Sequence, residues 1–109
     1  MPLNQQLTPD ITLVHNVLPT DTEEILRKRA YSALPRIIAD LGRQAGEAAL
    51  RGMPMSKEMP EGDKARLIRE TAEGYEKNLT QRQMYDVLED VVERLLKQKA
   101  EGPKDAGRR

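Results

Sequence analysis

Residues 79–100, LTQRQMYDVLEDVVERLLKQKA, contain the clearest local signal in the chain. Thr80 and Gln83 have the spacing of a capping box, and Leu79 and Met84 have the spacing of a hydrophobic staple. Apolar residues then recur in steps of three and four, as they do along one face of a helix. We therefore predict an amphipathic helix over residues 81–100. Its apolar stripe consists of Met84, Val87, Leu88, Val91, Val92, Leu95 and Leu96.

This helix requires a neighbour, because burying one stripe does not offset the entropy lost when about 20 residues become ordered. A second long helix is predicted over residues 20–51, where apolar residues repeat in the same steps from Leu26 to Ala48. Acidic residues follow its start, where the helix dipole favours them. Its candidate N-cap residues are Thr20, Asp21 and Thr22.

Pro35 interrupts the helix predicted over residues 20–51, because proline has no backbone N–H and its ring crowds the carbonyl four residues earlier. The helix kinks there, or a separate helix starts there, capped by Ser32 and with Pro35 in its first turn. The apolar register continues across Pro35, which favours a kink.

The segment GMPMSKEMPEG, residues 52–62, is too rich in glycine and proline for regular structure and is predicted to be the main loop. Asp63 is then expected to cap a third helix over residues 63–78. The fold class is accordingly all-α, a small helical bundle of three to four helices. We expect a flexible N-terminal arm at residues 1–19, one helical domain at 20–101 and a disordered tail at 102–109. Within the arm, residues 11–18 form an extended packing segment or a strand completed across a dimer.

Composition limits the setting and the oligomeric state. The chain of 109 residues has no Cys, Phe or Trp and only three Tyr, so its core must come from aliphatic residues. Small domains with a thin core gain from self-association, and we therefore expect a homodimer. The absence of cysteine, of a signal sequence and of a long apolar run indicates a cytoplasmic protein without a membrane span. Eighteen basic residues balance eighteen acidic ones.

Three groups of residues are candidates for a dimer or partner contact. Small residues at Ala39, Gly42, Gly46 and Ala49 leave one side of a helix open to close approach, either by another helix of the chain or by a partner. Met53, Met55 and Met59 plug the end of the bundle, contact a partner or, less favourably without Cys or His, bind Cu(I). The third group consists of apolar positions in the helix predicted over residues 81–100, namely Leu88, Val91 and Leu95.

Residues for catalysis are scarce. His15 is the only histidine, and a lone histidine without a matched neighbour is a poor catalyst and cannot build a multi-histidine zinc site. Carboxylate pairs such as Glu89 and Glu93 lie on solvated helix faces, whereas catalytic carboxylates need a desolvated, concave setting. No phosphate-binding glycine motif is present. We expect a protein that is not an enzyme and uses no metal or cofactor.

The amphipathic surface without reactive groups predicts a non-enzymatic helical protein–protein interaction module. Such a module is a dimeric small regulator, inhibitor or adaptor that binds a partner protein through an apolar helix face. The alternative is a regulatory or accessory protein that binds nucleic acid through the basic triplet Arg27, Lys28 and Arg29 and the basic tail. Solvated helix faces also carry such charges, and the chain has no overall basic excess.

Overall fold

The computed structural model describes residues 7–15 and 17–101. Those residues form an all-helical fold without a strand, which confirms the predicted all-α class. The three helices are α1 (Glu23–Arg51), α2 (Glu61–Asn78) and α3 (Gln81–Glu101), and the single-turn 3₁₀ helices are η2 (Ile11–Leu13) and η3 (Ser56–Glu58). Within the described residues, none of these helices has the length and apolar character needed to cross a membrane.

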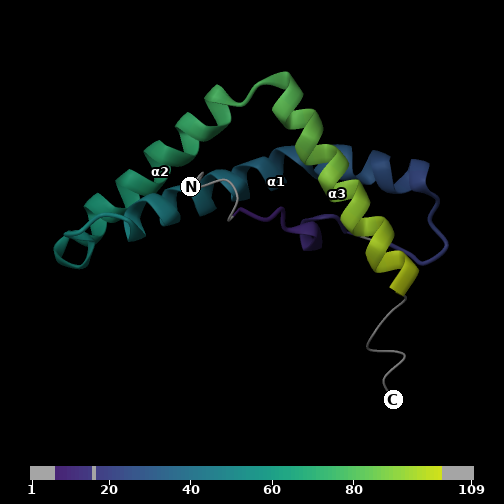
Figure 1. The fold of residues 1–109 in the computed structure, drawn as a ribbon, viewed down its shortest axis with the longest axis horizontal. Coiled ribbons are helices and arrows are strands. Elements are labelled where there is room, and N and C mark those ends of the chain that lie inside the picture. The colour runs from purple at the N-terminus through teal and green to yellow at the C-terminus, as the bar shows by residue number, and fades with distance from the viewer. Residues whose placement is uncertain (1–6, 16, 102–109) are drawn as a thin grey trace, which may run out of the picture.

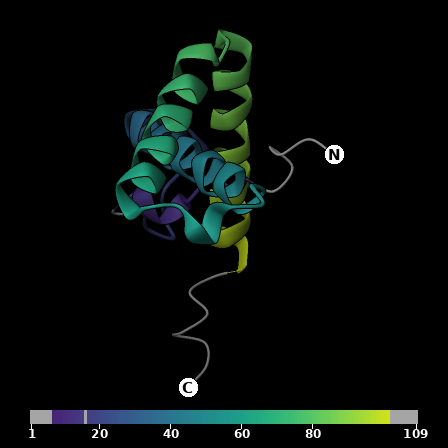
Figure 2. The same ribbon diagram turned by 90° about the vertical axis from the view of Figure 1, so that its left-hand side faces the viewer.

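The helix α1 is the common support on which the other two helices pack (Figure 1). After the loop at its C-terminal end, α2 returns beside the C-terminal half of α1. The chain then turns a sharp corner at residues 79–80, and α3 crosses the N-terminal half of α1. Figure 2 shows that this corner projects beyond α1. The corner is therefore the point at which the chain passes from one half of α1 to the other.

The corner between α2 and α3 contains the predicted capping box. The Thr80 N–H donates to Gln83 Oε1 at 2.8 Å, and the Gln83 N–H donates to Thr80 Oγ1 at 3.1 Å. These two bonds satisfy backbone donors that a helix start otherwise leaves without partners. The predicted start of the last helix at Gln81 is thus confirmed, and its end lies at Glu101, one residue beyond the prediction.

The helix α1 continues through Pro35. The alternative of a separate helix capped by Ser32 is therefore wrong, because the apolar register keeps one continuous face against the rest of the molecule. The kink expected at Pro35 stays a prediction. Of the candidate caps, Thr22 is the N-cap, and its Oγ1 accepts the Ile25 N–H at 3.3 Å.

The helix α2 begins earlier than the sequence predicted. Asp63 is not its cap, because Pro60 occupies the N-cap position and no side chain bonds the first N–H groups. Glu61 and Gly62 are exposed, so water can satisfy these N–H groups without a capping side chain. Asp63 instead lies in the first turn, where its Oδ1 accepts from Arg66 Nη2 at 3.3 Å.

The described part of the predicted arm packs onto the helices. Val14 is buried in the core, and η2 ends directly before it. Farther toward the N-terminus, the Thr8 N–H donates to Gln44 Oε1 at 3.2 Å, and Gln44 Nε2 donates to the Thr8 carbonyl at 2.9 Å. No strand forms over the described residues of the segment 11–18, since residues 11–13 are a 3₁₀ turn.

The core lies between α1, α3 and the segment before α1. The largest fully buried side chains belong to Leu26, Ile37, Val91, Val92 and Leu95, and none is aromatic. By contrast, α2 has no buried residue and contacts α1 through half-buried side chains. Tyr75 is the least exposed tyrosine, and burial raises the pKa of its hydroxyl. The thin aliphatic core expected from composition is therefore confirmed.

Candidate functional site

An apolar groove with a volume of about 570 Å³ lies between α1 and α3, below the corner. Each helix contributes one row of side chains with the spacing i, i+3, i+4, i+7, so that a single face of each helix borders the groove. Among the described residues that line the groove, α2 contributes only Glu76 and the corner contributes only Leu79. The row from α1 is Tyr31, Leu34, Pro35 and Ile38, and the row from α3 is Gln81, Met84, Tyr85 and Leu88.

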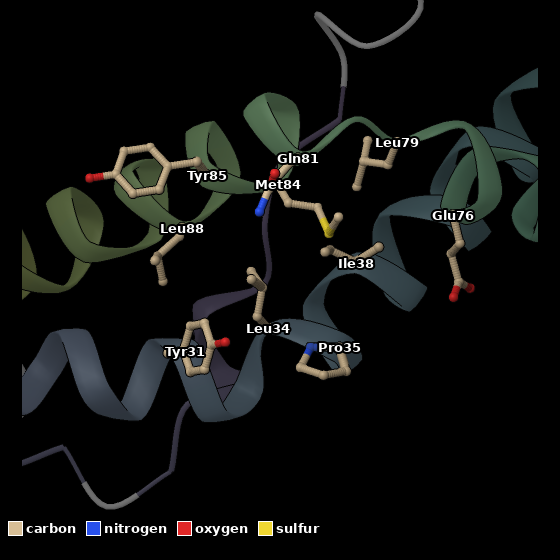
Figure 3. A pocket seen from close by; sticks show the side chains of 10 residues that line it. All are labelled: Tyr31, Leu34, Pro35, Ile38, Glu76, Leu79, Gln81, Met84, Tyr85 and Leu88. Carbon is tan, nitrogen blue, oxygen red and sulfur yellow. The ribbon is translucent and has the colours of Figure 1, made fainter.

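The side chains of the groove divide into a floor and a border (Figure 3). Leu34, Ile38, Met84 and Leu88 lie between the two helices, where Ile38 and Leu88 are each 7% exposed. The two tyrosines lie at one end of the groove, and Glu76 lies toward the opposite end. Tyr31 is 68% exposed and Tyr85 is 59% exposed. The chain thus presents a partly covered apolar floor between two solvent-exposed rings.

The polar atoms at the border have no partner within the part of the chain that the structure describes. The hydroxyls of Tyr31 and Tyr85, the side-chain amide of Gln81 and the carboxylate of Glu76 make no hydrogen bond or ion pair there. All four groups are exposed, so water satisfies them at present. They are available to orient a ligand that covers the floor.

The small-residue face predicted as a contact surface is used within the chain. A Cβ at Gly42 would lie 3.0 Å from the Ala72 carbonyl oxygen, and a Cβ at Gly46 would lie 2.8 Å from the Ile68 carbonyl oxygen. The backbone of α2 therefore covers both glycines. Of the other two predicted members of this face, Ala39 is exposed and Ala49 is half-buried.

The other partner candidates do not lie together on one surface. Val91 and Leu95 are in the core against α1, and Leu88 is shared between this core and the groove. Met53 and Met55 lie in the loop after α1 and are 39% and 64% exposed, whereas Met59 is half-buried. Only Leu88 of these residues borders the groove. The predicted homodimer stays a prediction.

The basic triplet does not form one surface. Arg27 donates to Glu89 of α3 and, at 3.1 Å, to Glu23, and these bonds raise the pKa of its guanidinium. Arg29 Nη1 lies 3.9 Å from Asp21 Oδ2, and Lys28 is exposed. Arg27 thus joins α1 to α3. The basic tail was predicted to include six residues. Arg94, Lys97 and Lys99 lie on α3, where Arg94 Nε is 3.0 Å from Asp90 Oδ1. The other three, Lys104, Arg108 and Arg109, lie outside the described residues.

His15 is exposed and lines a hollow on another face of α1, together with two arginines. No group of three or more His, Cys, Asp or Glu side chains with metal-binding geometry occurs among residues 7–15 and 17–101. The carboxylates Glu89 and Glu93 do not form a site, because Glu89 pairs with Arg27 and Glu93 is exposed.

Four residues of the groove were not predicted from the sequence as site residues: Tyr31, Tyr85, Glu76 and Gln81. One signal was present: Tyr31 precedes Leu34 and Ile38 by three and seven positions, and Tyr85 precedes Leu88 by three. Each helix therefore carries a second apolar row beside its core stripe. The two together form an apolar face that is wider than packing against one neighbouring helix requires.

Comparison with protein-family models, with curated proteins and with solved structures found no match to this chain.

Proposed function

We propose that this chain is a protein-binding module that holds an amphipathic helix of a partner protein in the groove between α1 and α3. The supporting observation is the groove itself, an apolar floor bordered by two exposed tyrosines and by polar groups without partners in the described chain. Exposed aromatic rings beside a concave apolar surface are typical of protein interfaces. A module of this kind serves in a small regulator, inhibitor or adaptor.

A helix suits this groove better than an extended peptide does. An extended peptide that adds to a protein through its backbone needs a free sheet edge, and the described residues contain no strand. The walls here are helices, whose backbone groups already bond within each helix. A helical ligand satisfies its own backbone and requires from the groove only apolar contact, which the two rows of side chains offer.

Charge gives the ligand a direction. Glu76 stands at the end of the groove away from the tyrosines and forms no ion pair among the described residues. A lysine or arginine of the ligand at that end would pair with its carboxylate, whereas an acidic residue would be repelled. The proposed ligand is therefore a short amphipathic helix with a basic residue near one end of its apolar stripe.

A panel of three synthetic peptides tests the proposal by NMR titration of the isotopically labelled full chain. The panel consists of an amphipathic helical peptide with one terminal lysine, a scrambled peptide of the same composition and a proline-rich peptide. We expect only the first peptide to shift the amide signals of Leu34, Met84 and Leu88 in a saturable manner. Equal binding of the scrambled peptide, or preference for the proline-rich peptide, would contradict the proposal.

Variants of the chain provide the matched control. Glu76→Gln should weaken binding of the lysine-ended peptide by a factor of about 1.4 to 5, since exposed charge pairs contribute about 0.2–1 kcal/mol. Glu73→Gln alters an exposed glutamate one turn earlier, outside the groove, and should leave the affinity unchanged. Sedimentation velocity at protein concentrations of roughly 1 to 100 μM tests whether a second copy of the chain fills the groove instead. Closure of the groove by self-association would overturn the proposed ligand.

A further inference from the structure

A second hollow, of about 330 Å³, lies on the face of α1 away from the groove and is bordered mainly by polar side chains. Arg29, Ser32 and Arg36 come from α1 at intervals of three and four residues, which places them in one row on the helix. His15 approaches from the segment before α1, and the buried Ala33 lies beneath. None of the described residues that border this hollow is acidic.

Positive charge exceeds negative charge around this hollow. One carboxylate that contacts its lining is that of Asp21, whose Oδ2 lies 3.9 Å from Arg29 Nη1. The same oxygen accepts the Leu18 N–H at 2.8 Å, and Asp21 is buried. Asp21 is therefore held in place and offsets one of the two guanidinium groups. The other guanidinium, that of Arg36, gives the described lining of the hollow a net positive charge.

Arg36 is fixed in position without losing its capacity to bind. Its Nη2 donates to the Leu13 carbonyl at 3.4 Å, which ties it to the segment that carries His15 two residues later. A guanidinium has five N–H donors in a planar fork, and this bond uses one of them. Toward the described residues, the other donors of Arg36 therefore remain for a ligand.

We infer that this hollow is an anion site that takes a single phosphate group between Arg36, Arg29, Ser32 and His15. A planar guanidinium matches two oxygens of a phosphate at once, and charge-assisted bonds of this type are stronger than neutral ones. The hydroxyl of Ser32 and an imidazole N–H of His15 donate to further oxygens. The ligand is inorganic phosphate or a small phosphate monoester. This site is independent of the groove and of its proposed helical ligand.

Titration of the labelled full chain with inorganic phosphate, followed by NMR at low ionic strength, tests the inference. We expect saturable shifts at the His15 ring and at the Ser32 and Arg36 amides, and none with an equal concentration of chloride. A parallel titration with O-phosphoserine identifies the source of the group. Tighter binding of the ester assigns a monoester ligand, and equal binding assigns free phosphate.

Two variants and one control make the result decisive. Arg36→Gln should weaken phosphate binding about tenfold, because it removes a charge-assisted pair, and His15→Gln should weaken it less. Both residues are exposed, and circular dichroism checks that the variants fold. Arg51→Gln, an exposed arginine at the end of α1 outside the hollow, should bind as the original chain does.

Phosphate binding that stays unchanged in Arg36→Gln, or that falls equally in Arg51→Gln, would overturn the site. So would shifts spread over all basic residues. A short duplex DNA that produces the same shifts more tightly than either small phosphate would replace the inferred ligand with a nucleic-acid backbone.

Discussion

At the scale of single residues, Gly46 limits how closely α1 and α2 approach. A Cβ there would lie 2.8 Å from the carbonyl oxygen and 2.9 Å from the Cα of Ile68, distances that real Cβ atoms essentially never show. Backbone atoms cannot rotate aside as a flexible side chain can. The glycine is therefore required by the contact, although glycine within a helix costs about 1 kcal/mol relative to alanine.

Replacing Gly46 with alanine should destabilise the protein. We expect Gly46→Ala to lower the free energy of unfolding by about 1–3 kcal/mol, because the two helices must move apart. Gly74→Ala is the matched control, since no heavy atom lies within 4 Å of the added Cβ. This control should raise the free energy of unfolding by up to about 1 kcal/mol. Urea denaturation followed by circular dichroism measures both, and a Gly46→Ala chain as stable as the original would contradict the contact.

At the scale of the elements, α2 is held differently from its neighbours. Its side chains are half-buried or exposed, whereas α1 and α3 share fully buried residues such as Leu26 and Val91. Segments with few buried apolar contacts open at lower free energy than the core does. The helix α2 should therefore be the first of the three to separate.

Hydrogen exchange measured by NMR under native conditions tests this order. We expect backbone amides in the middle of α2, such as those of Ala72 and Tyr75, to exchange through openings of lower free energy than the amides of Val91 and Leu95. The amides of Val91 and Leu95 report global unfolding in the same sample and serve as the internal reference. Equal protection in α2 and α3 would show that the three helices unfold as one unit.

At the scale of the whole molecule, the folded unit includes the segment before α1. Val14 belongs to the buried core, and Leu7, Ile11, Leu13 and Val17 pack against it. Thr8 and Gln44 anchor this segment to α1 through two hydrogen bonds. Gln44 of this anchor also bonds Asp40. Burial of the Asp40 carboxylate raises its pKa, but the hydrogen bonds that Arg43 and Gln44 donate to it outweigh this effect and hold the pKa below its usual value. A chain without this segment would expose the part of the core that Val14 and its neighbours cover.

A chain that begins at Pro19 should accordingly be less stable than the full chain. We expect the free energy of unfolding to fall by at least about 2 kcal/mol, the value of burying one aliphatic side chain with partial contributions from others. Val14→Ala in the full chain should remove about 1–2 kcal/mol. Leu18→Ala is the control and should change little, because Leu18 is 53% exposed. Thermal denaturation measures all three, and an unchanged midpoint in the shortened chain would contradict the prediction.

Local signals predicted the elements well, because they act within a few residues. The capping box of Thr80 and Gln83 fixed the start of α3, and the apolar steps indicated all three helices. The start of α2 was missed because an exposed helix end needs no capping residue, so Asp63 lies in the first turn and not at the cap. The continuation of α1 through Pro35 could not be predicted locally, because it depends on the packing of the whole apolar face of α1.

The site was less predictable, because it depends on how the helices are rotated about one another. Spacing marked Gly42 and Gly46 as open to close approach, but it does not say that Ile68 and Ala72 fill this space. Tyr31 and Tyr85 are 54 positions apart, as their numbers give, and only the crossing of α1 and α3 brings them to one groove. A pattern within either helix contains no information about that crossing.

The pairing of α1 with α3 has a consequence for synthesis on the ribosome. Arg27 and its partner Glu89 are 62 positions apart, and the buried face of α1 around Leu26 and Ile37 is covered by residues as late as Leu95. While the chain is being made, α2 can already lie beside the C-terminal half of α1, yet that buried face stays uncovered. Nascent chains in this condition are exposed to aggregation and proteolysis. The interval before α3 emerges is therefore the time at which we expect the chain to be most prone to aggregation.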